Sequence, residues 1–147
     1  MASTIYPIFK QELLQHTPGT SLSAGTVKCI MVSSAYTYSA DHRYKSSITS
    51  GIMQSGGVEA SITITPKTFV NGVFATSNTP YTFTAPTASV TSYIAMVVYI
   101  DTGNPATSPL VAYIDGFSVV PNEGDINILW DDLSNINGVT NDIIFAL

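Results

Sequence analysis

Residues 94–100 read Ile-Ala-Met-Val-Val-Tyr-Ile, so seven consecutive side chains are largely apolar. Successive side chains of a β-strand point to opposite faces of its sheet, and a strand of this kind must therefore be buried on both faces. Such a strand belongs in the middle of a sheet. We expect the N-terminal helix, a loop or another subunit to cover the second face.

Short segments rich in β-branched and aromatic residues occupy most of the remaining chain. The expected strands are residues 27–32, 58–65, 68–75, 81–84, 93–100, 110–114 with 117–120, 126–130 and 143–147. Asn71-Gly72 is a two-residue hairpin signal, because both central positions of such a turn favour positive φ. Ile62 and Ile64 alternate with hydroxyl residues, which predicts one buried and one wet face. About eight strands with short connections predict an all-β chain, built as an antiparallel sandwich or barrel.

Residues 3–16 are the one segment with a helical pattern. Ile5, Phe9 and Leu13 share one helix face, Pro7 fits a first turn, and Pro18-Gly19 ends the helix. A chain of 147 residues is the size of one compact domain. We therefore expect a single domain over residues 1–147, with a helix or arm at 1–20 and the β-structure at 26–147.

The charge distribution excludes several classes of partner. The chain has five basic and ten acidic residues and a net charge of −5, so it cannot assemble a basic face for nucleic acid. No apolar stretch approaches the ~20 residues of a membrane span. Lys10 and Glu12 stand where a signal peptide would be apolar, so we expect synthesis in a host cytoplasm without an export signal. The only cysteine, Cys29, lies in an apolar run and is expected to be a buried, unreactive thiol.

Residues 33–57 resist assignment to strands. Tyr36, Tyr38 and Tyr44 occur here among polar residues, which indicates a long ordered loop, since tyrosines supply packing area. Loops of this length are uncommon unless they bind something. The tyrosines suit a core, an interface or a sugar-binding platform.

The sequence offers few groups for catalysis or metal binding. Ser39, Asp41 and His42 are too close in sequence to form a triad, because neighbours on an extended chain point in opposite directions. The acidic turn at 131–138 does not fit an EF-hand, since its register would make Leu133 and Ile144 ligands; a solvated turn or an irregular calcium site remains. We expect no enzyme activity, no cofactor and no metal.

Six segments resemble a family of small virion proteins of tailed bacteriophages. They are YPIFKQELL (6–14), TVK (26–28), YTYSADH (36–42), YIDTG (99–103), SPLVAYID (108–115) and INILWD (126–131). The likeness runs in order through nearly the whole chain and implies similarity to jelly-roll cement, or decoration, proteins on the outer surface of capsids. It implies an antiparallel β-sandwich of jelly-roll type.

This resemblance implies a structural role in the virion rather than catalysis. A cement protein binds across joints between major capsid protein subunits and stabilises the head, here as a dimer or trimer. The candidate partner-binding residues are Asp131, Asp132, Arg43, Lys45, Tyr36, Tyr38 and Tyr44. Two alternatives remain, a tail or fibre component and a carbohydrate-binding adhesion module on the virion surface.

Overall fold

The computed structural model describes residues 3–76, 81–130, 138 and 142–147. These residues form a mostly β fold with one α-helix, and every paired strand is antiparallel. The helix is α1 (Pro7–Leu14), and Lys45–Ser47 form a short 3-10 turn. The strands are β1 (Thr4–Ile5), β2 (Thr26–Ser33), β3 (Gln54–Ser55), β4 (Val58–Glu59), β5 (Ser61–Thr63), β6 (Thr68–Val70), β7 (Val73–Ala75), β8 (Tyr81–Phe83), β9 (Tyr93–Asp101), β10 (Leu110–Val119), β11 (Ile126–Ile128) and β12 (Ile143–Ala146).

The largest sheet has five strands in the order β1-β10-β9-β2-β5, with β9 at its centre. All side chains from Ala95 to Ile100 are buried. β2 lies beside β9 in a register that pairs Cys29 with Val98. The expectation that the apolar segment 94–100 lies inside a sheet is therefore confirmed.

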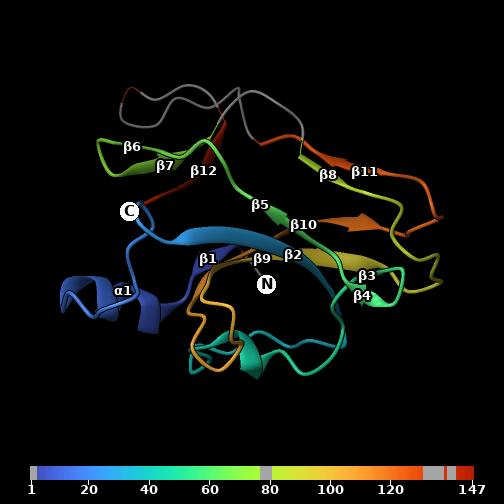
Figure 1. Ribbon diagram of the computed structural model, residues 1–147, viewed down its shortest axis with the longest axis horizontal. Helices are drawn as coiled ribbons and strands as arrows, with labels where there is room; N and C mark the ends of the chain where they lie inside the picture. The colour runs from blue at the N-terminus through green and yellow to red at the C-terminus, as the bar shows by residue number, and fades with distance from the viewer. Residues whose placement is uncertain (1–2, 77–80, 131–137, 139–141) are drawn as a thin grey trace.

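Two layers cover the faces of this sheet (Figure 1). Three-stranded β12-β7-β6 and two-stranded β11-β8 lie over one face. Helix α1 and the loops of residues 34–51 and 102–109 lie on the other side. Helix and loops of the same chain thus cover the second face, so β9 needs no other subunit for its burial.

The N-terminal helix is shorter than its sequence pattern predicts. Thr4 and Ile5 form β1 and pair with β10, and the Tyr6 N–H donates to the Val111 carbonyl at 3.0 Å. The residue before a proline disfavours helical backbone, which holds Tyr6 extended and lets α1 begin at Pro7. The helix ends at Leu14.

The strand count also differs from the expected eight, because short strands escape sequence analysis. The structure has twelve strands in the described residues. β1 and β3 have only two residues each, and the segments 58–65 and 68–75 each divide into two strands. The Asn71-Gly72 turn is confirmed, with φ of 50° and 78°. The alternation on β5 is confirmed as well, since Ile62 and Ile64 are buried.

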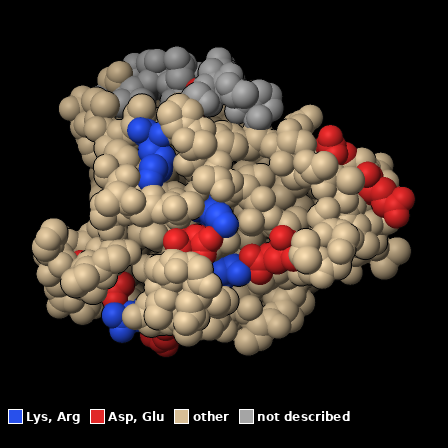
Figure 2. All heavy atoms as spheres, in the orientation of Figure 1, with Lys and Arg blue, Asp and Glu red and all other residues tan. Residues whose placement is uncertain are grey.

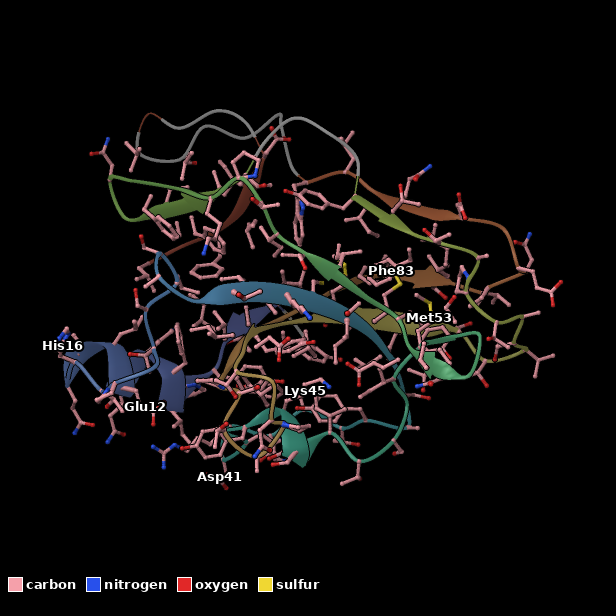
Figure 3. All side chains as sticks on the ribbon, viewed as in Figure 1. Glu12, His16, Asp41, Lys45, Met53 and Phe83 are labelled. Carbon is pink, nitrogen blue, oxygen red and sulfur yellow. The ribbon has the colours of Figure 1, made fainter. Side chains whose placement is uncertain are left out.

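One large cluster of buried side chains fills the space between the layers and extends below the five-stranded sheet. Figure 3 shows Met53 and Phe83 directed into this interior, and both are almost completely buried. Cys29 is fully buried, and desolvation raises the pKa of its thiol. The thiol therefore stays protonated, as the sequence predicts.

The packing of the loop 34–51 against β2 can be tested at Gly51. Gly51 and Gly103 have the same φ of 84°, but a Cβ on Gly51 would lie 2.9 Å from Ser33 Oγ and 3.1 Å from Tyr36 N, whereas one on Gly103 meets nothing within 4 Å. We expect Gly103→Ala to lower the free energy of unfolding by about 1 kcal/mol through backbone strain. Gly51→Ala should cost ~1–3 kcal/mol more through overpacking. Urea denaturation of both variants measures the difference, and equal losses would contradict this packing.

Candidate functional site

Four tyrosines from three distant segments meet on the face of the large sheet that α1 and the loops cover. Tyr6 precedes α1, Tyr36 and Tyr38 lie on the loop 34–51, and Tyr113 lies on β10. Ring centroids are 5.2 Å apart for Tyr6 and Tyr38 and 5.4 Å apart for Tyr38 and Tyr113. Tilted rings at such distances attract each other and bury large area. The cluster therefore joins the N-terminus, the long loop and the sheet.

A hydrogen-bond chain runs through the cluster. Tyr36 Oη lies 2.7 Å from Tyr6 Oη and 2.9 Å from His42 Nδ1. When the neutral imidazole accepts at Nδ1, Tyr36 donates to it and accepts from Tyr6. Two effects raise the pKa of Tyr6 above its usual value. Burial is the larger one, and the hydrogen bond to Tyr36 is the second. The phenol stays protonated, so the chain acts as a structural link.

A groove of about 660 Å³ opens beside the tyrosine cluster. Tyr38, Tyr113 and Phe117 contribute aromatic surface to it. Asp115 adds a carboxylate that accepts from Ser3 Oγ at 3.2 Å. Ser34, Thr37 and Ser118 add hydroxyl groups to the wall. The groove therefore combines ring surfaces with hydrogen-bonding groups.

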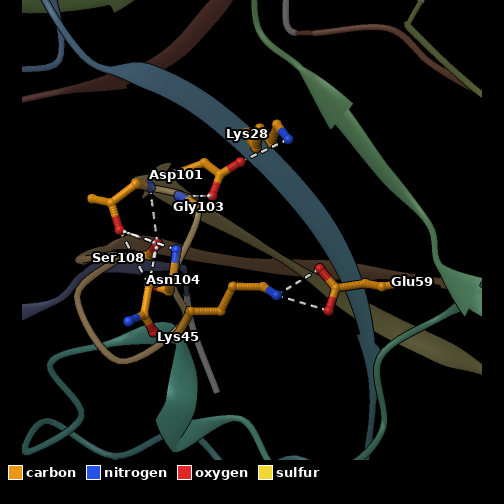
Figure 4. Close-up of polar contacts among 8 residues, drawn as sticks. Lys28, Lys45, Glu59, Asp101, Gly103, Asn104 and Ser108 are labelled. Carbon is orange, nitrogen blue, oxygen red and sulfur yellow. Dashed lines mark hydrogen bonds and ion pairs between the residues drawn. The ribbon is translucent and has the colours of Figure 1, made fainter.

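Two ion pairs lie on the face of the large sheet that also carries the tyrosine cluster (Figure 4). Lys28 Nζ lies 2.7 Å from Asp101 Oδ2, and Lys45 Nζ lies 2.7 Å from each oxygen of Glu59. The Lys45 ammonium also sits 5.3 Å from the centre of the Tyr99 ring. The contacts of Lys45 attach the loop 34–51 to β4 and β9, whereas the Lys28–Asp101 pair joins β2 to β9.

The loop of residues 102–109 is held by its own polar groups. Gly103 N–H donates to Asp101 Oδ1 at 2.9 Å, and Ser108 Oγ donates to the Asn104 carbonyl at 2.9 Å (Figure 4). The Thr102 N–H in turn donates to Ser108 Oγ. The hydrogen bonds from Lys28 and Gly103 lower the pKa of Asp101. The carboxylate is therefore ionised at neutral pH and fixes both the lysine and the loop.

Arg43 and Tyr44 continue the same loop. The Arg43 guanidinium forms an ion pair with Glu12 of α1, whose side chain is buried. It also lies 4.8 Å from the centre of the Tyr44 ring. Burying the Glu12 carboxylate without a partner would lower the free energy of unfolding. The ion pair with Arg43 avoids this loss and so holds α1 against the loop.

The structure thus brings together some of the predicted partner-binding residues and separates others. Tyr36 and Tyr38 belong to the tyrosine cluster, with Tyr36 buried and Tyr38 half-buried. Arg43, Tyr44 and Lys45 are neighbours on the loop, with both cations in intramolecular ion pairs. Asp131 and Asp132 lie outside the described residues. A partner that uses Arg43 or Lys45 would have to compete with Glu12 or Glu59.

Sequence analysis did not identify Tyr6, Tyr113 or Glu59 as members of this region. Their contacts join segments that lie far apart in the chain, and no local spacing reports such contacts. His42 carried a weak signal, because it follows the tyrosines of the same loop. It is half-buried rather than a free surface side chain.

The outward charge is mainly acidic. Lys28, Arg43 and Lys45 are held by carboxylates, and the Lys67 ammonium donates to the backbone carbonyls of residues 22, 23 and 25. Figure 2 shows charges of opposite sign side by side near the centre of one face, acidic groups alone at one end, and few charges elsewhere. With four of five cations engaged internally, the net charge of −5 dominates the potential that a partner meets.

Other kinds of site were sought in the described part of the chain. No group of three or more metal-ligating side chains occurs there. None of its helices is long and apolar enough to cross a membrane. The turn 131–138, where an irregular calcium site remained an interpretation, lies outside the described residues except for Gly138.

Comparisons with family models, curated proteins and solved structures find no match to this chain.

The Lys28–Asp101 pair gives a prediction about pH. The pKa of Asp101 is lowered in the folded state, so its stabilising effect is present above the unfolded pKa of about 4 and is lost as pH falls. We expect Asp101→Asn to lower the free energy of unfolding by on the order of 1 kcal/mol at pH 7. The deficit should shrink below pH ~4, where the wild-type carboxylate is also neutral.

Asp125→Asn is the matched control. Asp125 accepts from the Ala85 N–H at 2.8 Å but forms no ion pair among the described residues. Urea denaturation across pH compares the two variants with wild type. A deficit of Asp101→Asn that stays constant down to pH 3 would show that the ion pair contributes nothing.

Proposed function

We propose that this chain is a structural protein of a tailed-bacteriophage virion, a capsid cement protein on the outer surface of the head. It binds across joints between subunits of the major capsid protein, as a dimer or trimer, and catalyses no reaction. The observation that carries the proposal is the internal use of the cations. Three of the five basic residues form ion pairs within the chain and Lys67 binds backbone carbonyls, so the excess negative charge of −5 is what a basic partner surface would meet.

The architecture supports a cement role. Two layers of antiparallel strands resemble a β-sandwich, and we propose the jelly-roll type for their arrangement. The long loop is fixed by aromatic packing and ion pairs, so little ordering entropy is lost when it meets a partner. A rigid protein that binds only the assembled shell stabilises that shell by mass action. Many copies make a modest single contact effective.

Charge reversal tests the electrostatic part of this proposal. We expect Asp131→Lys combined with Asp132→Lys to lower occupancy on purified heads about ten-fold or more, because a basic capsid surface would repel the new cations. The control variant combines Asp41→Lys with Glu123→Lys. It changes the net charge by the same amount but replaces two other exposed acidic residues, so it should keep the occupancy of wild type. Gel densitometry of sedimented heads measures occupancy, and circular dichroism checks folding. Occupancy equal to wild type for the first variant would contradict the proposed contact.

Copy number separates a head protein from a tail or fibre component. A cement protein should be present in hundreds of copies per particle, as its binding across repeated capsid joints requires. A tail or fibre component should be present in few. Densitometry of purified virions against the major capsid protein distinguishes the two locations.

The groove beside the tyrosine cluster favours one further candidate function, carbohydrate binding. Tyr38 and Phe117 are half-buried, so each ring keeps an accessible part for stacking on a sugar. Asp115 and the hydroxyl residues supply hydrogen bonds for sugar hydroxyls. Binding sites commonly combine apolar walls with a few polar groups in this way. An adhesion module would use this groove to attach the virion to surface glycans.

A glycan array tests this candidate. We expect any glycan signal of wild-type protein to fall about ten-fold or more in Tyr38→Ala, because the stacking surface is removed. Tyr38→Phe keeps the ring and should retain most of the signal. Because Tyr38 packs on Tyr6 and Tyr113, thermal unfolding of both variants must confirm that they fold. A wild-type array without signal would reject carbohydrate binding.

A further inference from the structure

A second groove is lined by residues of β1, β10 and β12 and shares Tyr113 with the groove beside the tyrosine cluster. Its larger part, about 590 Å³, has walls of Ile5, Ile114, Trp130 and Ile144 among other residues. Its smaller part, about 340 Å³, lies against α1 and the end of the chain. The two parts share Ile5, Lys10 and Ala146 and are therefore neighbours, and we name the surface that they form together the α1–β12 face.

Both strands beside this depression stand at the ends of their sheets. β1 ends the five-stranded sheet, and β12 ends the three-stranded sheet. β1 covers β10 at only two positions, opposite Ala112 and Tyr113. Edge strands present unpaired backbone groups and are the usual place where a second chain adds a strand. The α1–β12 face therefore offers hydrogen-bonding edges beside an apolar floor.

The rim of the α1–β12 face is apolar and exposed. Leu14 is 90% exposed, Leu147 66% and Leu129 58%, and all three line the depression. In the wall, Trp130 is buried, and its Nε1 has no hydrogen-bond partner among the described residues. Exposed leucines grouped around an apolar depression are typical of a protein interface.

The low charge of this face favours a second copy of the chain as its partner. The net charge of −5 makes copies of this chain repel each other, and this repulsion is weakest where two copies meet through surfaces with few charges. Among the residues that the structure describes, Lys10 is the only charged side chain that lines either part of the depression. An almost uncharged surface is compatible with a copy of itself, because identical surfaces then bring together few like charges.

We infer that the α1–β12 face is the contact surface between copies of this chain. A second copy covers Leu14, Leu129 and Leu147 and brings a strand edge to β1 or β12. This inference rests on the part of the proposed function that joins copies into a dimer or trimer, and it adds which surface makes the contact.

Light scattering coupled to gel filtration, from micromolar to near-millimolar protein, tests the inference. We expect wild-type protein to form a closed oligomer, and Leu14→Glu and Leu129→Glu each to raise its dissociation constant about ten-fold or more. Val90→Glu is the matched control, because Val90 is 99% exposed and lines neither part of the depression. Trp130 is the only tryptophan, so its emission should change with concentration in wild type and not in Leu14→Glu.

Three outcomes would overturn the inference. They are a wild-type monomer at every concentration, an oligomer that both leucine variants leave intact, and an equal loss in Val90→Glu. Circular dichroism establishes that each variant is folded. Occupancy on purified heads is measured in parallel, so a monomer that still occupies the shell refutes this contact surface while the proposed function stands.

Discussion

Burial of the central strand β9 on both faces is the constraint on which the rest of the structure depends. The side chains from Ala95 to Ile100 are buried on both faces of β9, which requires two covering layers, and only one of these layers is made of sheets. Helix α1 and two loops supply the other. Loops cover a sheet poorly when they are polar, and the tyrosines solve this problem, because each ring gives apolar area while its hydroxyl finds a partner, as Tyr6 and Tyr36 do with each other. The long loop is thus ordered because the sheet beneath it needs cover.

Because the chain has few charged residues, each ion pair joins one particular pair of structural elements. Arg43 joins the loop to α1, Lys45 joins it to β4, and Lys28 joins β2 to the end of β9. Exposed pairs of this kind contribute little alone, but each one here selects one arrangement of a loop. The exterior is acidic overall because the chain has ten acidic and five basic residues, and four of those bases are already bound to groups of the chain itself. Fold stability and partner preference therefore come from the same few residues.

Local patterns predicted the features that depend on neighbouring residues. The Asn71-Gly72 turn and the buried run at 94–100 need only spacing and residue type, and both are confirmed. β1 could not be predicted, because Thr4 and Ile5 become a strand only when β10 lies beside them. The tyrosine cluster was half predicted, since Tyr36 and Tyr38 share one loop whereas Tyr6 and Tyr113 join it through the fold. Arg43 and Lys45 were proposed as partner contacts, but no local signal shows that Glu12 and Glu59 already engage them.

The two open strand edges connect the proposed contact between copies with the proposed place on a capsid. Proteins usually protect edge strands with charges, prolines or a covering segment. Here Pro7 lies two residues after the end of β1, yet the apolar rim that includes Leu14 stays exposed. Such an edge is a hazard for a chain that must remain dispersed at high concentration. It is useful to one that is held at fixed positions on a lattice, because a weak contact between copies then becomes populated through high local concentration.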